Sequence, residues 1–213
     1  MTAAEISALA VAAGVGPGVA VLDVCCGTGG PGRFLAGQLG CAYLGVDESA
    51  RAVALARERT NGLPCRFAVA PVPPLPAGSF DVVLLLEVML AFQDKDALVR
   101  DIAAALRPGG RFAFTLEAGP PLTTAERAGL VVTWRDDYSR AHGAMAQALA
   151  GAFAADAEDI AGRIGHRALG DLLAAHRLWT RWLGEGRMRK FAVVAERPTR
   201  PPYARCVHDR GPS

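Results

Sequence analysis

The sequence predicts an α/β fold, in which a doubly wound, mostly parallel sheet of seven strands is covered by helices on both faces. Strand-like apolar segments and amphipathic helical segments alternate from residue 19 to residue 116, as βαβ units require. Residues 80–86 form a nearly continuous apolar run, which is typical of a central parallel strand buried on both faces. A glycine-rich loop follows the first strand, at a position where such folds bind ligands.

The first half of the chain contains three strands and three helices. Thr2 and Glu5 have the spacing of a capping box, so a first helix is expected to begin there and to end near Gly14. The strands are expected at residues 19–24, 43–46 and 65–69, and the helices between them at 31–40 and 49–59. This order corresponds to two βα units followed by a third strand.

The second half continues the alternation less regularly. Residues 70–79 contain four prolines and are expected to form a loop. Further strands are expected at 80–86, 111–116, 130–134 and 190–195, with a helix at 94–106. Only a short helical turn, 124–128, precedes the strand at 130–134, although a crossover normally takes ten or more residues. Either this crossover is abbreviated, or a segment is missing between Thr124 and Gly129.

Residues 138–184 have a helical pattern interrupted by glycines, and we expect this insertion before the last strand to cover a substrate. Residues 197–213 contain four prolines and no apolar period, so a loose tail is expected there. A chain of 213 residues that is 51% hydrophobic is long enough for one large core and short for two enzyme domains. We therefore predict a single domain over residues 1–196.

The charge, the cysteines and the N-terminal residues of the chain limit which partners, metals and compartment we expect. The net charge of +2 comes from scattered arginines, so we expect no nucleic-acid or membrane partner and instead a small-molecule substrate. The five cysteines include no C-x-x-C pair, and no histidine lies at zinc-ligand spacing, so we expect no disulfide framework and no metal. The first twenty residues lack a signal peptide pattern, and we expect a cytoplasmic protein.

The glycine-rich loop has the form G-x-G-x-x-G at Gly27, Gly29 and Gly32, and Asp47 follows Gly27 by twenty residues. This spacing is the dinucleotide fingerprint, so an NAD-dependent oxidoreductase is one interpretation. Asp23 opposes it, because it lies in the first strand four residues before Gly27, where its carboxylate would repel a pyrophosphate and would attract an ammonium group.

Four motifs in order resemble class I S-adenosylmethionine-dependent methyltransferases that act on small molecules. They are LDVCCGTGG at 22–30, YLGVDES at 43–49, PAGSFDVV at 76–83 and ALRPGGRF at 105–112. The resemblance covers residues 21–116 and implies the class I methyltransferase fold, with a final antiparallel strand and with S-adenosylmethionine as cofactor. It identifies the chain as a member of that family rather than as a dinucleotide enzyme.

The resemblance implies a set of cofactor-binding residues. Asp23 would hold the methionine ammonium, and the backbone from Cys25 through Gly27 and Thr28 to Gly29 would wrap the methionine and the ribose. Asp47 would bind both ribose hydroxyls, with Glu48 beside the adenine, although Asp47 could instead be only a cap for the helix that follows. The remaining positions that correspond to family cofactor contacts are Val69, Ala70, Leu86 and Glu87.

The chain departs from the family in two places. Val69 and Ala70 stand where the family usually has an acid for the adenine amino group, and Ala91 stands where many members have a histidine near the transferred methyl group. The candidate catalytic residues are therefore Glu87 and Glu117, at the ends of the fourth and fifth strands, and His142 in the helical insertion. Direct displacement requires a base only for a protonated nucleophile.

The resulting expectation is methyl transfer from S-adenosylmethionine to an oxygen, nitrogen or carbon atom of a small molecule, with natural-product biosynthesis as the setting. Further candidates for lining the acceptor pocket, beside His142, are Trp134, Tyr138, Trp179 and Trp182, although helix aromatics usually pack in the core. A second subunit of a possible homodimer could help to cover the pocket. The alternatives are a cyclase or isomerase with the same fold, a non-catalytic cofactor-binding subunit and the NAD-dependent enzyme.

Overall fold

A computed structural model of the chain describes residues 1–75, 80–117 and 122–199. It contains one seven-stranded sheet in the order β3-β2-β1-β4-β5-β7-β6. The strands are β1 Ala20–Val24, β2 Ala42–Asp47, β3 Cys65–Val69, β4 Phe80–Leu85, β5 Leu106–Glu117, β6 Val131–Asp137 and β7 Lys190–Glu196. β7 is antiparallel to both β5 and β6, and the other pairings are parallel. The predicted mostly parallel α/β sheet is confirmed.

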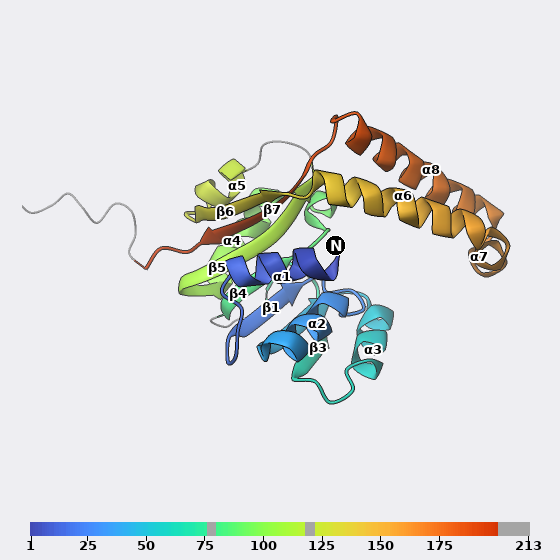
Figure 1. Cartoon of the computed structure of the whole chain (residues 1–213). Coiled ribbons are helices and arrows are strands. Elements are labelled where there is room, and N and C mark those ends of the chain that lie inside the picture. Colours follow the sequence, from blue (N-terminus) through green and yellow to red (C-terminus); the bar gives the residue numbers. More distant parts are fainter. Residues whose placement is uncertain (76–79, 118–121, 200–213) are drawn as a thin grey trace, which may run out of the picture.

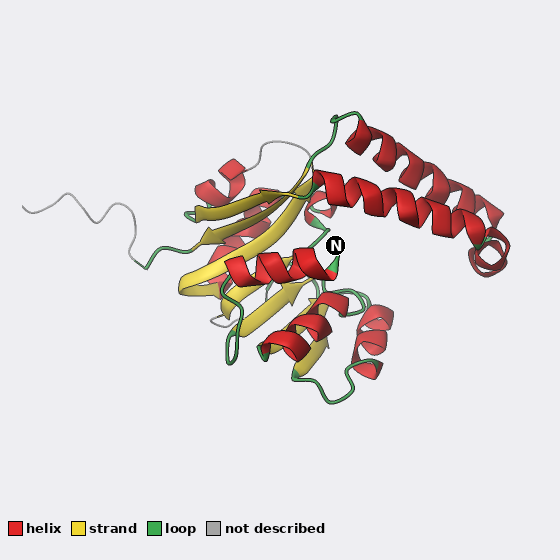
Figure 2. Cartoon of the chain, viewed as in Figure 1, coloured by secondary structure: helices red, strands yellow, loops and turns green. Residues whose placement is uncertain are grey.

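Helices cover both faces of this sheet (Figures 1 and 2). The helices α1 Ala3–Ala12, α2 Gly30–Leu39 and α3 Ala50–Glu58 cover one face, and α4 Lys95–Ala105 and α5 Leu122–Arg127 cover the other. A 3₁₀ turn, η1 Met89–Ala91, follows β4. The alternation of strand side chains divides the core between the two faces, since Val21 packs with α1 and α2 whereas Leu22 packs with α4.

The predicted helical insertion lies between β6 and β7 as α6 Ser139–Ala155, α7 Ala157–Ile164 and α8 His166–Gly184. Helices α6 and α8 run side by side and extend beyond the end of the sheet (Figure 1). A small cluster of Ala146, Leu183 and Met188, flanked by Trp179 and Trp182, packs between them. Within the described residues, no helix has the length and apolar character needed to cross a membrane.

Several boundaries differ from the sequence-based expectation. β5 begins at Leu106 instead of 111, because Leu106 already pairs with Phe80 before an irregularity in the register. The crossover from β5 to β6 is abbreviated, since α5 has six residues. Tyr138, a predicted pocket residue, is 6% exposed and its hydroxyl donates to the Glu5 carbonyl at 3.1 Å, so this side chain packs against α1. Most of the predicted tail, residues 200–213, lies outside the described residues.

Candidate functional site

The glycine loop after β1 is shaped by left-handed backbone conformations and by close packing. Cys25, Gly27 and Gly29 have φ angles of 60°, 55° and 70°. A Cβ at Gly29 would lie 2.4 Å from the Phe67 ring, and one at Gly32 would lie 2.0 Å from the Tyr43 ring, so both glycines allow α2 to approach the sheet. A Cβ at Gly27 would meet nothing within 4 Å, because this glycine faces an open cavity.

Asp23 lies in the middle of the sheet and faces that cavity, which has a volume of about 400 Å³. Its side chain is 2% exposed and accepts a hydrogen bond from the Tyr43 hydroxyl. Burial raises the pKa of Asp23 to about 7, while the bond from Tyr43 acts in the opposite direction. The carboxylate has no cationic partner among the residues that the structure describes, so a ligand cation would stabilise its charged form.

Asp47 holds the loop from the end of β2. Its Oδ2 accepts from the Gly27 amide at 2.8 Å, and its Oδ1 accepts from the Ser49 amide at 2.9 Å. Ser49 itself is the N-cap of α3, so Asp47 is not the helix cap. Each carboxylate oxygen has a further lone pair available for a ligand hydroxyl. Asp47 and Glu48 line a second cavity, of about 430 Å³.

The two cavities meet at Cys25, which lines both. We call them together the strand-end groove, since they run along the carboxyl ends of β1, β2 and β4 and are also lined by Leu86, Glu87, Val88 and Phe92. Burial and neighbouring carboxylates raise the pKa of the Cys25 thiol to about 11, which makes a thiolate role unfavourable.

Four predicted cofactor residues do not line the strand-end groove, namely Thr28, Gly29, Val69 and Ala70. Thr28 is exposed and Gly29 packs against Phe67. Val69 pairs with Asp47 in the neighbouring strand, and the Ala70 amide donates to the Asp47 carbonyl at 3.0 Å. These last two residues therefore lie beside the Asp47 end of the groove, as backbone neighbours of Asp47.

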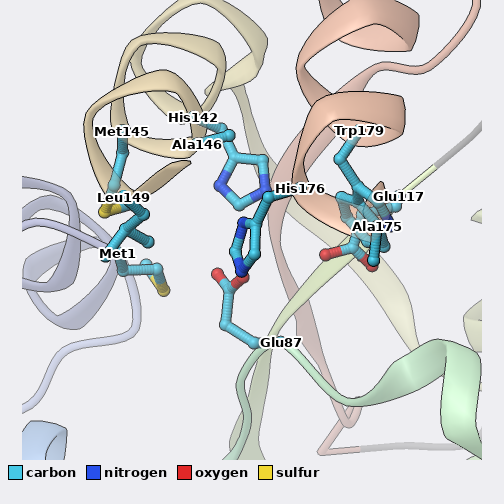
Figure 3. Close-up of a pocket in the computed structure, with 10 residues that line it drawn as sticks. All are labelled: Met1, Glu87, Glu117, His142, Met145, Ala146, Leu149, Ala175, His176 and Trp179. Atoms are coloured by element: carbon cyan, nitrogen blue, oxygen red, sulfur yellow. The ribbon is translucent and has the colours of Figure 1, made fainter. Parts of the chain in front are cut away.

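A third cavity, of about 370 Å³, lies between the ends of β4 and β5 and the helices α6 and α8 (Figure 3). We call it the hairpin cavity. Its lining residues are Met1, Glu87, Glu117, His142, Met145, Ala146, Leu149, Ala175, His176 and Trp179. The structure thus brings the three predicted catalytic residues, Glu87, Glu117 and His142, to one cavity, although they come from three separate elements. Glu87 and Met1 also line the strand-end groove.

A buried lysine, which the sequence analysis missed, joins these three residues. Lys190 is 1% exposed, and its Nζ lies 3.4 Å from Glu117 Oε1 and 3.3 Å from His142 Nδ1, and forms an ion pair with Glu87. It is placed there because the first residue of β7 pairs with Glu117, the last residue of β5. Its only signal in the sequence is a lysine at the start of an apolar strand.

The electrostatics of this cluster follow from burial and from Lys190. Burial raises the pKa of Glu117, and the Lys190 ammonium partly offsets this effect. Burial and the same ammonium lower the pKa of His142, so the imidazole is neutral at physiological pH. Potential ligand atoms of Glu87, Glu117 and His142 lie within 4.8 Å of one another. Lys190 contacts all three, so its ammonium supplies a positive charge at the centre of the cluster.

The backbone at Glu87 is held in an uncommon conformation. Its φ angle is 65°, in the left-handed region that a residue with a side chain rarely adopts. The Glu87 amide donates to the Thr115 hydroxyl at 2.7 Å, and Thr115 is fully buried in β5. Such conformations persist where the surroundings fix them and are found at functional sites. Here the conformation directs Glu87 to the boundary between the strand-end groove and the hairpin cavity.

Comparisons with known proteins show a sequence likeness largely within the first half of the chain. Residues 21–110 match the family model described as a methyltransferase domain. Phosphoethanolamine N-methyltransferase 1 of Arabidopsis thaliana is 39% identical over 99 residues, covering 45% of this chain and 20% of that protein. Methyltransferase GfsG of Streptomyces halstedii is 39% identical over 105 residues, covering 46% of this chain and 38% of that protein. The chain therefore spans well under half the length of these curated relatives.

A solved structure extends the likeness to nearly the whole fold. The [4+2]-cyclase SpnF has a TM-score of 0.81 and 24% sequence identity, with 93% of this chain and 81% of that chain covered. At this identity, the likeness concerns the fold. S-adenosylmethionine is the cofactor of the family to which the matched domain belongs. The dinucleotide interpretation of the glycine loop is thereby superseded. Through residues 21–110, the chain is similar to the methyltransferase-domain family.

Proposed function

We propose that this protein transfers a methyl group from S-adenosylmethionine to a small, largely apolar acceptor. The observation that carries the proposal is the junction at Glu87, which, like Met1, lines both the strand-end groove and the hairpin cavity. A cofactor in the groove and an acceptor in the cavity would meet at this junction. Methyl transfer requires such a meeting, because catalysis depends on the alignment of the two reacting atoms and on exclusion of water.

The groove residues fit the cofactor. Asp23 is a buried carboxylate with no cationic partner in the described part of the chain and suits an ammonium, and Asp47 offers one free lone pair on each oxygen to the ribose hydroxyls. Gly27 leaves open space where the ligand would contact the backbone. When bound, S-adenosylmethionine supplies a methyl group activated by a sulfonium. The chain itself has to bind, orient and cover this group.

The hairpin cavity suits an acceptor with an apolar skeleton and a polar group at one end. Met145, Leu149 and Trp179 supply apolar surface from α6 and α8, and the side chains of Glu87, Glu117 and His142 line the same cavity (Figure 3). A volume of about 370 Å³ falls in the range of small-molecule pockets. Phosphoethanolamine, named for one relative, is smaller and more polar than these walls favour, so we propose a different acceptor.

The proposal is tested with purified protein, methyl-labelled S-adenosylmethionine and a small-molecule extract of the source organism. Label should enter one compound, and mass spectrometry should show a gain of one methyl group. A Glu87→Gln variant should lower the rate, since this residue lies at the junction, while the exposed Glu58→Gln should not. Consumption of a compound with no change in mass would instead indicate a cyclase or isomerase. Cofactor binding without turnover would indicate a binding subunit.

A further inference from the structure

Lys190 is buried beneath the hairpin cavity, and its surroundings determine how the neighbouring groups can act. Its ammonium contacts Glu87, Glu117 and His142, which belong to three other elements of the fold. An ammonium has three N–H donors and no acceptor, so Lys190 can act only as a donor in these contacts. Three hydrogen bonds would use its full donor capacity, and the polar groups around it would all act as acceptors.

For His142 this requirement fixes the position of the ring proton. Nδ1 lies 3.3 Å from Lys190 Nζ and accepts its hydrogen bond, so the neutral ring carries its proton on Nε2. Nε2 forms no hydrogen bond with the described part of the chain, and the ring lines the hairpin cavity. The imidazole therefore presents an N–H donor there. Use of Nε2 as a base would create an imidazolium 3.3 Å from an ammonium, which is unfavourable.

For the carboxylates, the donor role of Lys190 leaves an acceptor atom, instead of a donor, facing the cavity. Glu87 binds Lys190 through Oε2, which leaves Oε1 as a free acceptor, and 34% of the side chain is exposed at the cavity. Glu117 is only 3% exposed and lies deeper, at 3.4 Å from the ammonium. Glu87 is therefore the carboxylate with access to an acceptor molecule, and Glu117 balances the charge of Lys190 from behind.

We propose that Lys190 is a positioning residue that keeps His142 as the Nε2–H donor and Glu87 as the proton acceptor, so that the cavity accepts a hydroxyl. This inference rests on the proposed function. A hydroxyl can accept a bond from His142 with one lone pair and donate its proton to Glu87. In the transfer, the hydroxyl oxygen forms the bond to the methyl carbon, the carbon–sulfur bond breaks with its electron pair remaining on sulfur, and the proton moves to Glu87. A protonated amine has no lone pair for His142.

The tautomer of His142 can be measured without any substrate. The full chain is labelled with ¹⁵N-histidine, and long-range ¹H–¹⁵N spectra are recorded over a pH series, with a His142→Gln variant to assign the signals. We expect His142 to be the Nε2–H tautomer and to titrate below the usual range. In Lys190→Met, loss of the ammonium should raise its titration midpoint and allow Nδ1–H. His176 lines the same cavity and serves as the internal control whose signals should not change.

The charges that act on this ring are those of Lys190, Glu87, Glu5 and the amino group of Met1, and the Glu117 carboxylate lies within 4.8 Å of it. Lys190→Met leaves Glu117 buried without its cation and could therefore fail to fold. The double variant Lys190→Met/Glu117→Gln removes one charge of each sign, so no buried carboxylate loses its cation. The same ¹⁵N-histidine spectra are recorded for this variant. An Nδ1–H tautomer in the unsubstituted protein, or an unchanged tautomer and midpoint in either variant, would show that Lys190 does not position His142.

The acceptor class is tested separately by fragmentation of the methylated product from the labelling experiment. A new O–CH₃ group supports the hydroxyl acceptor, whereas an N–CH₃ or C–CH₃ group overturns it even though the proposed function would stand. If no methylated product forms, the proposed function and the acceptor class both fall. The histidine spectra would still decide the role of Lys190, because they require neither cofactor nor acceptor.

Discussion

Asp23 in the strand-end groove and Lys190 beneath the hairpin cavity are both buried charged residues, but their charges are balanced in different ways. Lys190 has two carboxylates and an imidazole around its ammonium. Asp23 has a hydrogen bond from the neutral Tyr43 hydroxyl, and burial raises its pKa to about 7. A buried charge without an opposite charge is costly. A cationic ligand in the groove would therefore stabilise the charged form of Asp23, whereas the ammonium of Lys190 is already balanced by the carboxylates of Glu87 and Glu117.

The largest effect that follows from this difference concerns stability. Burial raises the pKa of Asp23 to about 7 in the folded state, above its ordinary value of 3.8, so the folded state holds the extra proton between these values. The contribution of Asp23 to the free energy of unfolding is therefore expected to fall as pH rises from about 4 to about 7, by up to about 4 kcal/mol. Asn keeps an acceptor for Tyr43 without the charge. We expect Asp23→Asn to be more stable than the unsubstituted protein by a few kcal/mol near pH 8, and to match it near pH 4, in urea titrations.

Equal stability of the two proteins near pH 8 would show that Asp23 is solvated or paired in solution, which would remove the contrast with Lys190. Glu58→Gln on the exposed end of α3 is the matched control, because the same change there should leave the pH dependence unaltered. The comparison requires the protein without cofactor, since a bound cation would stabilise the ionised carboxylate.

The second prediction concerns the ligand that would balance Asp23. We expect Asp23→Asn to weaken S-adenosylmethionine binding about 100-fold, because a hydrogen bond between two charged groups is replaced by one to a neutral amide. Binding to the unsubstituted protein should also weaken as pH falls below about 7, since Asp23 then binds a proton that the ligand must displace. Isothermal titration calorimetry over a pH series measures both effects. Unchanged affinity in the variant would contradict the assignment of Asp23 to the methionine ammonium.

A smaller loss of S-adenosylmethionine affinity is expected when Asp47, at the other end of the groove, is replaced. Asp47→Asn retains one acceptor oxygen but replaces the other with an NH₂ donor, which would oppose either the Gly27 amide or a ribose hydroxyl. We expect affinity for S-adenosylmethionine to fall about tenfold, which corresponds to one hydrogen bond of about 1.4 kcal/mol. Methylthioadenosine lacks the methionine ammonium but keeps the ribose, so its affinity should fall by the same factor in Asp47→Asn and should not depend on Asp23. A loss confined to S-adenosylmethionine would contradict the ribose assignment.

The two regions also differ in how far the sequence predicts them. In the groove, Asp23, Gly27 and Asp47 lie within one βαβ unit, where spacing along the chain determines spacing in the fold, and the structure places them around connected cavities. The spacing does not predict the contact of Gly29 with Phe67 on β3, because that contact depends on packing that no local pattern encodes. Similarly, Tyr43 reads in the sequence as an ordinary strand residue, and only the pairing of β1 with β2 brings it to Asp23.

In the hairpin cavity, sequence reasoning identifies Glu87 and Glu117 because the carboxyl ends of parallel strands face one edge of a sheet. It identifies His142 only as a member of the helical insertion, since an apolar stripe equally suits a packed histidine. Lys190 is missed because its position depends on the antiparallel register of β7 against β5, which pairs it with Glu117 across more than seventy residues. The residue that organises the cluster is thus the one that only the tertiary structure identifies.

The smallest expected effect is that of divalent metal ions on thermal stability. It tests whether Lys190 already occupies the position that a metal ion would take in the hairpin cavity. Glu87, Glu117 and His142 offer the ligand types of a divalent metal, but such an ion would have to displace the Lys190 ammonium, which already contacts all three. We therefore expect EDTA, Mg²⁺, Mn²⁺ and Zn²⁺ each to leave the thermal unfolding midpoint unchanged within error. A rise in the midpoint with one of these ions, lost in Glu117→Gln, would mean that Lys190 leaves the cluster to make room for a metal. In that case His142 would be a ligand, and its Nε2–H could no longer be assigned from Lys190.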